Sequence, residues 1–168
     1  MSSNPYAAPR AAVGDVETVQ EFQEIRLWSA SGRIGRLRYL AYAIGGTIAA
    51  VAVAGVLVAA MGGLGAVLAV LVYIAATVFS ILIMIQRSHD MNWTGWTILL
   101  SIIPFVGLIW LFKPGTEGVN DYGAPPPPNT TAVKVLGIVL PILVVLVGIL
   151  AAIAIPAYAD YVRRTGGG

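Results

Sequence analysis

Residues that could do chemistry gather in one short stretch of this 168-residue chain. Ser88, His89 and Asp90 are the residue types of a hydrolytic triad, but they are consecutive, and helix neighbours one apart do not face each other. His89 is the only histidine and cysteine is absent, so one chain cannot form a multi-histidine or thiolate metal site. Neither an HExxH motif nor a phosphate-binding loop occurs. We therefore predict a protein that is not an enzyme and uses no metal or cofactor.

The same stretch suits binding at a membrane surface. Arg87 and Asp90 are three residues apart, so they can pair on one helical turn. A charge drawn into hydrocarbon costs roughly 2.5–3.5 kcal/mol, which places this pair at the interface. Trp93 and Trp96 carry indole rings that settle at head-group level. An ordinary anchored turn and a site for a head group or a protein partner both fit this pattern.

A second basic group, Arg33, Arg36 and Arg38, lies in the run SGRIGRLRY. Each arginine near anionic lipid is worth about 1 kcal/mol, and the planar guanidinium suits phosphate. Retention of this segment on the cytoplasmic side would explain the group without a ligand. The sharper hypothesis is that these arginines join the later cluster to hold a phosphate-bearing head group. The predicted binding residues are Arg33, Arg36, Arg87, His89, Asp90, Trp93 and Trp96.

Long apolar blocks must position these residues. The chain is 58% hydrophobic and 11% charged, whereas about a quarter of a soluble domain is charged. A hydrocarbon core of ~30 Å needs roughly 20 helical residues. We predict an all-α polytopic membrane bundle of about four transmembrane helices with a short N-terminal cytoplasmic segment. The four blocks are Tyr39 to Met61, Gly65 to Gln86, Trp96 to Phe112 and Val135 to Tyr158.

The spacing of the blocks predicts how they connect. Only Gly62 to Leu64 separates the first two, so they should form an antiparallel hairpin. The third block has 17 residues and contains Pro104. We expect it to cross the membrane as a short tilted helix, and the alternative is a re-entrant segment packed on its neighbours.

The cations predict the orientation, because arginine and lysine near span ends are retained in the cytoplasm. With four spans and both termini inside, only Lys113 and Lys134 of the ten cations lie outside. If the third block does not cross, Lys134 moves inside and the C-terminus outside, and charge alone hardly separates the two topologies. The cations inside in the four-span topology are Arg10, Arg26, Arg33, Arg36, Arg38, Arg87, Arg163 and Arg164.

Four regions follow from this pattern. Residues 1–30 comprise a disordered tail and a candidate helix at Asp15 to Trp28, which lies on the membrane surface or folds back on the protein. Residues 31–126 form a three-helix membrane unit. Residues 127–133 are a linker that follows the start of a stiff proline run. Residues 134–168 form a last helix with a basic tail.

At the polar motifs the chain resembles a bacterial inner-membrane family known as domain of unknown function 805. The runs SGRIGRLRYL, QRSHDMNWTGWTILLSIIPFVGLIWLF and PGTEGVNDYGAPPP carry this resemblance in order. The resemblance implies a small multipass membrane protein and brings no established activity. Its loop motif corresponds here to Gly115, Gly118, Asn120, Tyr122 and Gly123.

The last block carries a second resemblance. GILAAIAIPAYADYVRR, from Gly148 to Arg164, is similar to the hydrophobic helix of type IV pilins. Lys134, Val135 and Val139 stand where the pilin pattern has its cleavage-site glycine, the following residue and a glutamate, so pilin processing is not expected. A pilin helix ends outside the cytoplasm, opposite to the four-span topology.

These observations lead to one hypothesis and two alternatives. We expect a non-catalytic, multipass inner-membrane protein that binds membrane lipids or a membrane partner, with a last helix that docks on pilus-type helices. The first alternative is a small transporter or lipid-handling protein with Arg87, His89 and Asp90 in a polar cleft, in which case a homo-oligomer would complete the path. The second is a minor pilin-like subunit. No nucleic-acid partner is expected.

Overall fold

The computed structural model describes residues 22–166. Within these residues helices are the regular elements, and one isolated bridge joins Asn120 and Gly123, so the predicted all-α class is confirmed there. The predicted tail, and the part of the predicted first helix before Phe22, lie outside the described residues. The elements are α1 (Arg36–Asp90), the 3-10 helices η1 (Gly95–Ile102) and η2 (Val106–Leu108), α2 (Ile109–Phe112) and α3 (Thr131–Thr165).

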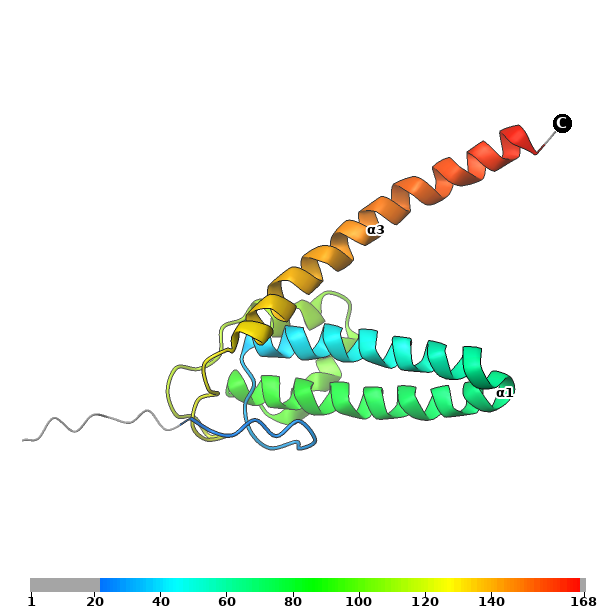
Figure 1. Ribbon diagram of the computed structural model, residues 1–168. Coiled ribbons are helices and arrows are strands. Elements are labelled where there is room, and N and C mark those ends of the chain that lie inside the picture. Colours follow the sequence, from blue (N-terminus) through cyan, green and yellow to red (C-terminus); the bar gives the residue numbers. More distant parts are fainter. Residues whose placement is uncertain (1–21, 167–168) are drawn as a thin grey trace, which may run out of the picture.

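Helix α1 is a hairpin of two antiparallel arms (Figure 1). The chain reverses at Gly62, whose φ of 56° and ψ of −125° lie outside the helical region. This backbone conformation is open essentially to glycine alone. The predicted hairpin is therefore confirmed, with its reversal concentrated at one residue.

The two ends of α1 come together at one end of the hairpin. Residues 22–35 and 113–130 gather around them, and we call this region the polar end (Figure 1). The backbone N–H of Ile34 donates to the carbonyl of Gln86 at 3.2 Å, which fastens the start of one arm to the end of the other. The buried charged side chains of the described residues are Arg33, Arg38, Arg87 and Asp90, and all lie here.

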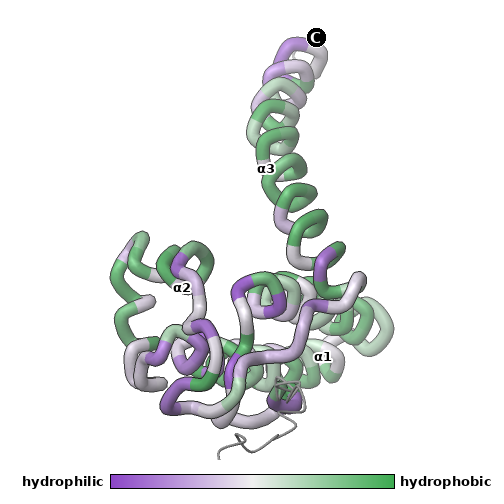
Figure 2. The backbone as a smooth tube through the Cα atoms, turned by 90° about the vertical axis from the view of Figure 1, so that its left-hand side faces the viewer, coloured by the Kyte–Doolittle hydropathy of each residue, from purple (hydrophilic) through white to green (hydrophobic). Residues whose placement is uncertain are grey.

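The remaining surface of α1 and α3 is apolar. Both helices are long and apolar enough to cross a membrane, by length and composition. Only 11% of the most apolar window of α1 and 0% of that of α3 are buried, unlike the core helices of a soluble protein. Figure 2 shows hydrophobic residues along α3 and hydrophilic residues near its C-terminal end. These features indicate a membrane protein.

The third apolar block differs from the expected transmembrane helix. It is divided into η1, η2 and α2, and the break between η1 and η2 contains Pro104 and Phe105. Phe105 has a left-handed φ of 67°, and a proline lacks the N–H that would continue a helix. At ~2.0 Å per residue, η1 is about 16 Å long, roughly half of a hydrocarbon core. The block is therefore not one continuous helix, and a fourth transmembrane helix is not confirmed.

Helix α3 starts beside the start of α1 and then diverges from the hairpin (Figure 1). Thr130 caps it, since its side chain accepts from the N–H of Val133 at 3.3 Å. Gly137 allows the contact with α1, because a Cβ there would lie 2.6 Å from the carbonyl oxygen of Leu37. Beyond this contact α3 is largely uncovered. The predicted last helix is confirmed as a continuous helix.

The segment before α1 is not the predicted helix in its described part. From Phe22 to Trp28 the chain forms no helix and has one turn, at Leu27 and Trp28. Its backbone groups bond to other segments instead: the N–H of Gln23 donates to the carbonyl of Pro125 at 3.2 Å, and Gln86 donates to the carbonyl of Arg26 at 2.8 Å. These contacts replace the helical hydrogen bonds, so the segment is a strap across the polar end.

Candidate functional site

Asp90, the last residue of α1, is bonded to two buried arginines. Arg87 Nη1 lies 2.6 Å from Asp90 Oδ2, and Arg33 Nη2 lies 3.2 Å from Asp90 Oδ1. Both guanidinium groups are fully buried. The predicted pairing of Arg87 with Asp90 is confirmed. Arg33 adds a second ion pair from a segment 57 residues away.

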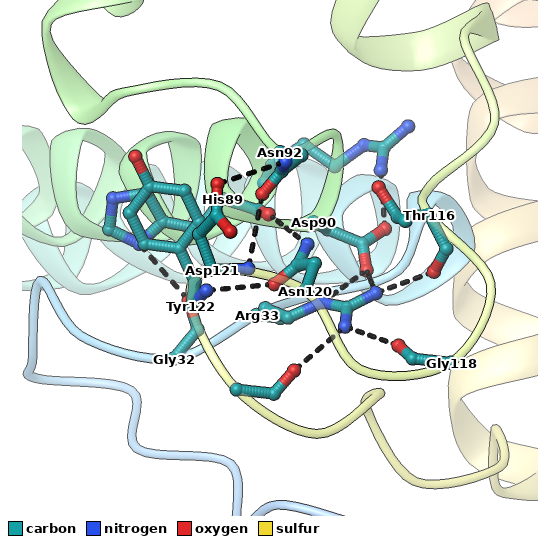
Figure 3. Close-up of polar contacts among 12 residues, drawn as sticks. Gly32, Arg33, His89, Asp90, Asn92, Thr116, Gly118, Asn120, Asp121 and Tyr122 are labelled. Carbon is teal, nitrogen blue, oxygen red and sulfur yellow. Dashed lines mark hydrogen bonds and ion pairs between the residues drawn. The ribbon is translucent and has the colours of Figure 1, made fainter.

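Arg33, in the segment just before α1, holds the loop after α2 in place (Figure 3). Its Nη1 donates to the carbonyls of Gly118 at 2.7 Å and Gly123 at 3.0 Å. Its Nη2 donates to the carbonyl of Thr116 at 2.6 Å and, with Nε, to Asp90. All five N–H groups of this guanidinium are therefore used within the protein.

Arg87 fastens the third apolar block in the same way. Its Nε donates to the carbonyl of Trp110 at 2.9 Å, and its Nη2 donates to the carbonyl of Lys113. Trp110 is fully buried, and its indole N–H donates to the hydroxyl of Ser88 at 2.8 Å. The end of the block is thus fixed to the last turn of α1.

The glycine-rich loop motif fits around these charges. A Cβ on Gly115 would overlap Oδ2 of Asp90, so any other residue at this position would have to displace the loop or the carboxylate. The N–H of the next residue, Thr116, donates to the carbonyl of Asp90 at 2.7 Å. Gly118 and Gly123 have φ of 69° and 110° and present their carbonyls to Arg33.

Asn120 holds the tip of this loop on α1 (Figure 3). Its Nδ2 donates to the carbonyl of His89 at 2.9 Å, and its Oδ1 accepts from the N–H of Tyr122 at 2.9 Å. The backbone groups of Asn120 and Gly123 exchange hydrogen bonds of 3.1 and 3.0 Å. The structure therefore brings the predicted loop motif together with Arg33, Arg87 and Asp90.

His89 is stacked on Tyr122. The ring centroids are 3.9 Å apart and the planes differ by 6°. His89 Nδ1 lies 3.2 Å from the carbonyl oxygen of Gly32, and because a carbonyl only accepts, Nδ1 carries the hydrogen in this contact. The histidine thus connects the segment before α1, through Gly32, with α1 and the loop.

The other predicted residues lie at the rim. Trp96 is 80% exposed, and Arg36 is exposed with one hydrogen bond, from Nη1 to the carbonyl of Phe112 at 3.1 Å. Trp93 meets the Trp110 ring edge-on at 5.9 Å, and the ammonium of Lys113 lies 5.2 Å from a Trp93 ring centroid.

Trp110 and Ser88 were missed as site residues, and Arg38, part of the predicted basic group, was left out of the predicted binding residues. Arg38 is buried and donates to the carbonyls of Pro127 at 3.1 Å and Pro128 at 3.0 Å. Trp110 and Ser88 form the hydrogen bond described above. The run SGRIGRLRY contains Arg38, but nothing in the sequence showed that carbonyl groups would be its hydrogen-bond partners.

A cavity of about 460 Å³ opens between the start of α1, the end of the third block and the linker before α3. Its wall is amphipathic: charged and amide groups lie beside leucine side chains. Asp90 lies on this wall with its charge paired to the two buried arginines. The lining residues used below are Arg36, Asn129, Leu37, Leu40 and Leu111.

The site is suited to binding and fastening. Residues 22–166 contain no group of three or more histidine, aspartate or glutamate side chains that could hold a metal. A transporter cleft built on Arg87 and Asp90 is not favoured, because both side chains are buried and bonded to protein groups.

The fold and the site together define a helical membrane protein whose polar end is fastened by buried arginines. The chain belongs to the family described as Protein of unknown function (DUF805), whose family model matches residues 27–124. This confirms the first resemblance. No curated protein and no solved structure matches the chain. The match ends before α3, so the similarity of Gly148 to Arg164 to pilin helices stays a prediction.

Proposed function

We propose that this protein is a non-catalytic, multipass protein of the bacterial inner membrane that binds the phosphate of an anionic lipid beside Arg36. The observation that carries this proposal is the imbalance of charge at the polar end. Six cations lie there with four carboxylates, and Asp90 forms ion pairs with Arg33 and Arg87. The cations are Arg26, Arg33, Arg36, Arg38, Arg87 and Lys113, and the carboxylates are Glu24, Asp90, Glu117 and Asp121. An excess of guanidinium groups attracts anionic head groups.

The arginines have different parts in this proposal. Arg33 and Arg87 use their N–H groups on Asp90 and on carbonyls, so they supply positive potential without touching a ligand. Arg36 is exposed and lines the cavity, and its single hydrogen bond leaves its other N–H groups available. A guanidinium with several available donors suits a phosphate group.

The cavity supports a lipid rather than a free anion. Asn129 beside Arg36 offers an amide to glycerol or ester oxygens, and Leu37, Leu40 and Leu111 offer an apolar wall to the first part of an acyl chain. A ligand that is charged at one end and apolar at the other matches both parts. Trp96 at the rim adds an indole at head-group depth.

Native mass spectrometry tests the proposal. The probes are phosphatidylglycerol and phosphatidylcholine, which share acyl chains and differ in net charge. We expect retention of phosphatidylglycerol in preference to phosphatidylcholine. Arg36→Gln should weaken phosphatidylglycerol binding about fivefold, the equivalent of about 1 kcal/mol.

The matched control is Arg163→Gln, which removes the same charge from the exposed opposite end of α3. It should leave lipid retention unchanged. Equal retention by wild type and Arg36→Gln, or an equal loss in both variants, would disprove the head-group site.

A second proposal concerns α3, which we infer to dock on a helix of a pilus-type membrane partner. The exposure of α3 supports this proposal, since among residues 131–165 only Val133 and Gly137 are buried. Small residues such as Ala151 and Ala154 permit close helix contact in lipid. Ala151→Leu should reduce co-purification of full-length protein with pilus-assembly components, whereas Val147→Leu, in the preceding turn, should not. Absence of such components from the wild-type preparation would refute docking.

A further inference from the structure

We infer that the third apolar block, Trp96 to Phe112, is a re-entrant segment embedded in the acyl chains of the leaflet next to the polar end. It enters and leaves this leaflet on the same side. The surface thus formed takes lipid chains as its partner, and it is independent of the proposed head-group site.

The two ends of the segment lie together. Trp93, before the segment, and Trp110, near its end, are 5.9 Å apart between ring centroids. Arg87 holds Trp110 through its carbonyl at 2.9 Å, and the N–H of Trp93 donates to the carbonyl of Ser88 at 2.9 Å. Both anchors belong to the last turn of α1. A segment that crossed would carry these ends to opposite faces of a ~30 Å core.

The middle of the segment presents large apolar side chains outward. Ile102 is 80% exposed and Phe105 is 84% exposed. No charged residue occurs between Asp90 and Lys113. An uncharged stretch of this length, with large apolar side chains uncovered at its middle, matches hydrocarbon and not water.

Several backbone groups at the break in the segment are paired, as hydrocarbon favours. Irregular chain is not tolerated against lipid, because unpaired N–H and C=O groups are not hydrated there. Here short-range hydrogen bonds pair three N–H groups around the break: that of Ile103 donates to the carbonyl of Leu100 at 3.1 Å, that of Val106 to Ile103 at 3.2 Å, and that of Leu108 to Phe105 at 3.0 Å. The hydroxyl of Ser101 is also paired within the segment.

The reach of the segment restricts it to one leaflet. In Figure 1 it stays beside the half of the hairpin nearest the polar end and does not approach the turn at Gly62. Trp96, 80% exposed, and Phe112, 71% exposed, lie near its two ends, where aromatic rings settle at head-group level.

This placement changes the topology from four crossings to three. The start of α3 lies at the polar end, so its C-terminal end lies across the membrane from that end. The distribution of arginine and lysine between the two sides then favours a polar end in the cytoplasm. Arg26, Arg33, Arg36, Arg38, Arg87, Lys113 and Lys134 lie on that side, and Arg163 and Arg164 lie opposite.

Single cysteines in this cysteine-free chain provide the test. Thr94→Cys, Lys113→Cys and Thr165→Cys are made in the full-length protein and treated in oriented vesicles with a membrane-impermeant maleimide. We expect Thr94→Cys and Lys113→Cys to react from the same side and Thr165→Cys from the other. Reaction of Thr94→Cys and Lys113→Cys from opposite sides would overturn the inference.

Depth is measured with bimane on Phe105→Cys and lipids brominated along their acyl chains. We expect strong quenching by bromines in the upper half of the chain and no reaction with the impermeant maleimide. Reaction with the maleimide without quenching would place the tip in water and overturn the inference. Gly63→Cys, at the turn of α1, is the control for the far side and for correct insertion. None of these outcomes depends on lipid binding at Arg36.

Discussion

Gly115 lies against the carboxylate of Asp90 so closely that no side chain fits between them. Only the Cα hydrogens of Gly115 lie between the loop backbone and the carboxylate at the end of α1. We expect Gly115→Ala to destabilise the protein by about 1–3 kcal/mol, because the added methyl group must push the loop or the ion pairs apart. The measurement is the midpoint of unfolding by SDS in detergent micelles.

Gly148→Ala is the control for this substitution. A Cβ there would meet no heavy atom within 4 Å, and alanine favours the helix, so stability should stay the same or rise. A Gly115→Ala protein as stable as wild type would contradict the close fit.

Asp90→Asn should be more damaging. It leaves Arg33 and Arg87 buried without their carboxylate, and removal of one partner of a buried pair costs about 3–5 kcal/mol. Asp160→Asn is the matched control, since its pair with Arg163 is exposed and 3.5 Å apart and should contribute at most about 1 kcal/mol. Unfolding curves for the two variants should separate clearly. Similar curves would mean that the buried pairs do not stabilise the polar end.

The stack of His89 on Tyr122 predicts a difference between two substitutions. Tyr122→Phe keeps the ring and should remain close to wild type, because the Tyr122 hydroxyl makes no hydrogen bond within the described residues. Tyr122→Leu removes the stack and should lose about 0.5–1.5 kcal/mol. Thermal unfolding of both variants, followed by circular dichroism, checks this order. A larger loss in the phenylalanine variant would assign the role to the hydroxyl.

The hairpin turn gives a fourth prediction. Gly62→Ala forces a side chain into a backbone conformation that only glycine adopts readily, at a cost of about 1–3 kcal/mol. Gly63→Ala, one residue later, has open space around its Cβ and no positive φ, and should be neutral or slightly stabilising. The ratio of folded to unfolded protein in an SDS titration measures the stability of both variants. Equal losses of stability in the two variants would show that a side chain at Gly62 does not strain the turn.

The sequence predicted the features that depend on local spacing. The hairpin followed from two apolar blocks joined by glycines, and the pairing of Arg87 with Asp90 followed from their separation by three positions. Both depend on neighbours in the chain, so composition and periodicity are enough to find them.

The features that the sequence did not predict depend on distant groups. Arg33 and Arg38 bind backbone carbonyls, and a carbonyl occurs at every residue, so no side-chain pattern marks the acceptor. The third block was expected to be a single helix, because apolar composition is the same for one continuous helix and for the divided block that the structure shows. The strap from Phe22 to Trp28 was expected to be helical, and its contacts with Pro125 and Gln86 could not be read from its own residues.

The separation of Arg33 from its partners also orders the biosynthesis of the protein. The ribosome makes Arg33 well before Asp90 and long before Thr116, Gly118 and Gly123, whose carbonyls the guanidinium later binds. While the hairpin is being synthesised, Arg33 is therefore without its final partners. Docking of the loop is a late step that becomes possible only when Gly123 has left the ribosome. A nascent chain arrested before that residue would hold a hairpin that Arg33 has not yet joined to the loop.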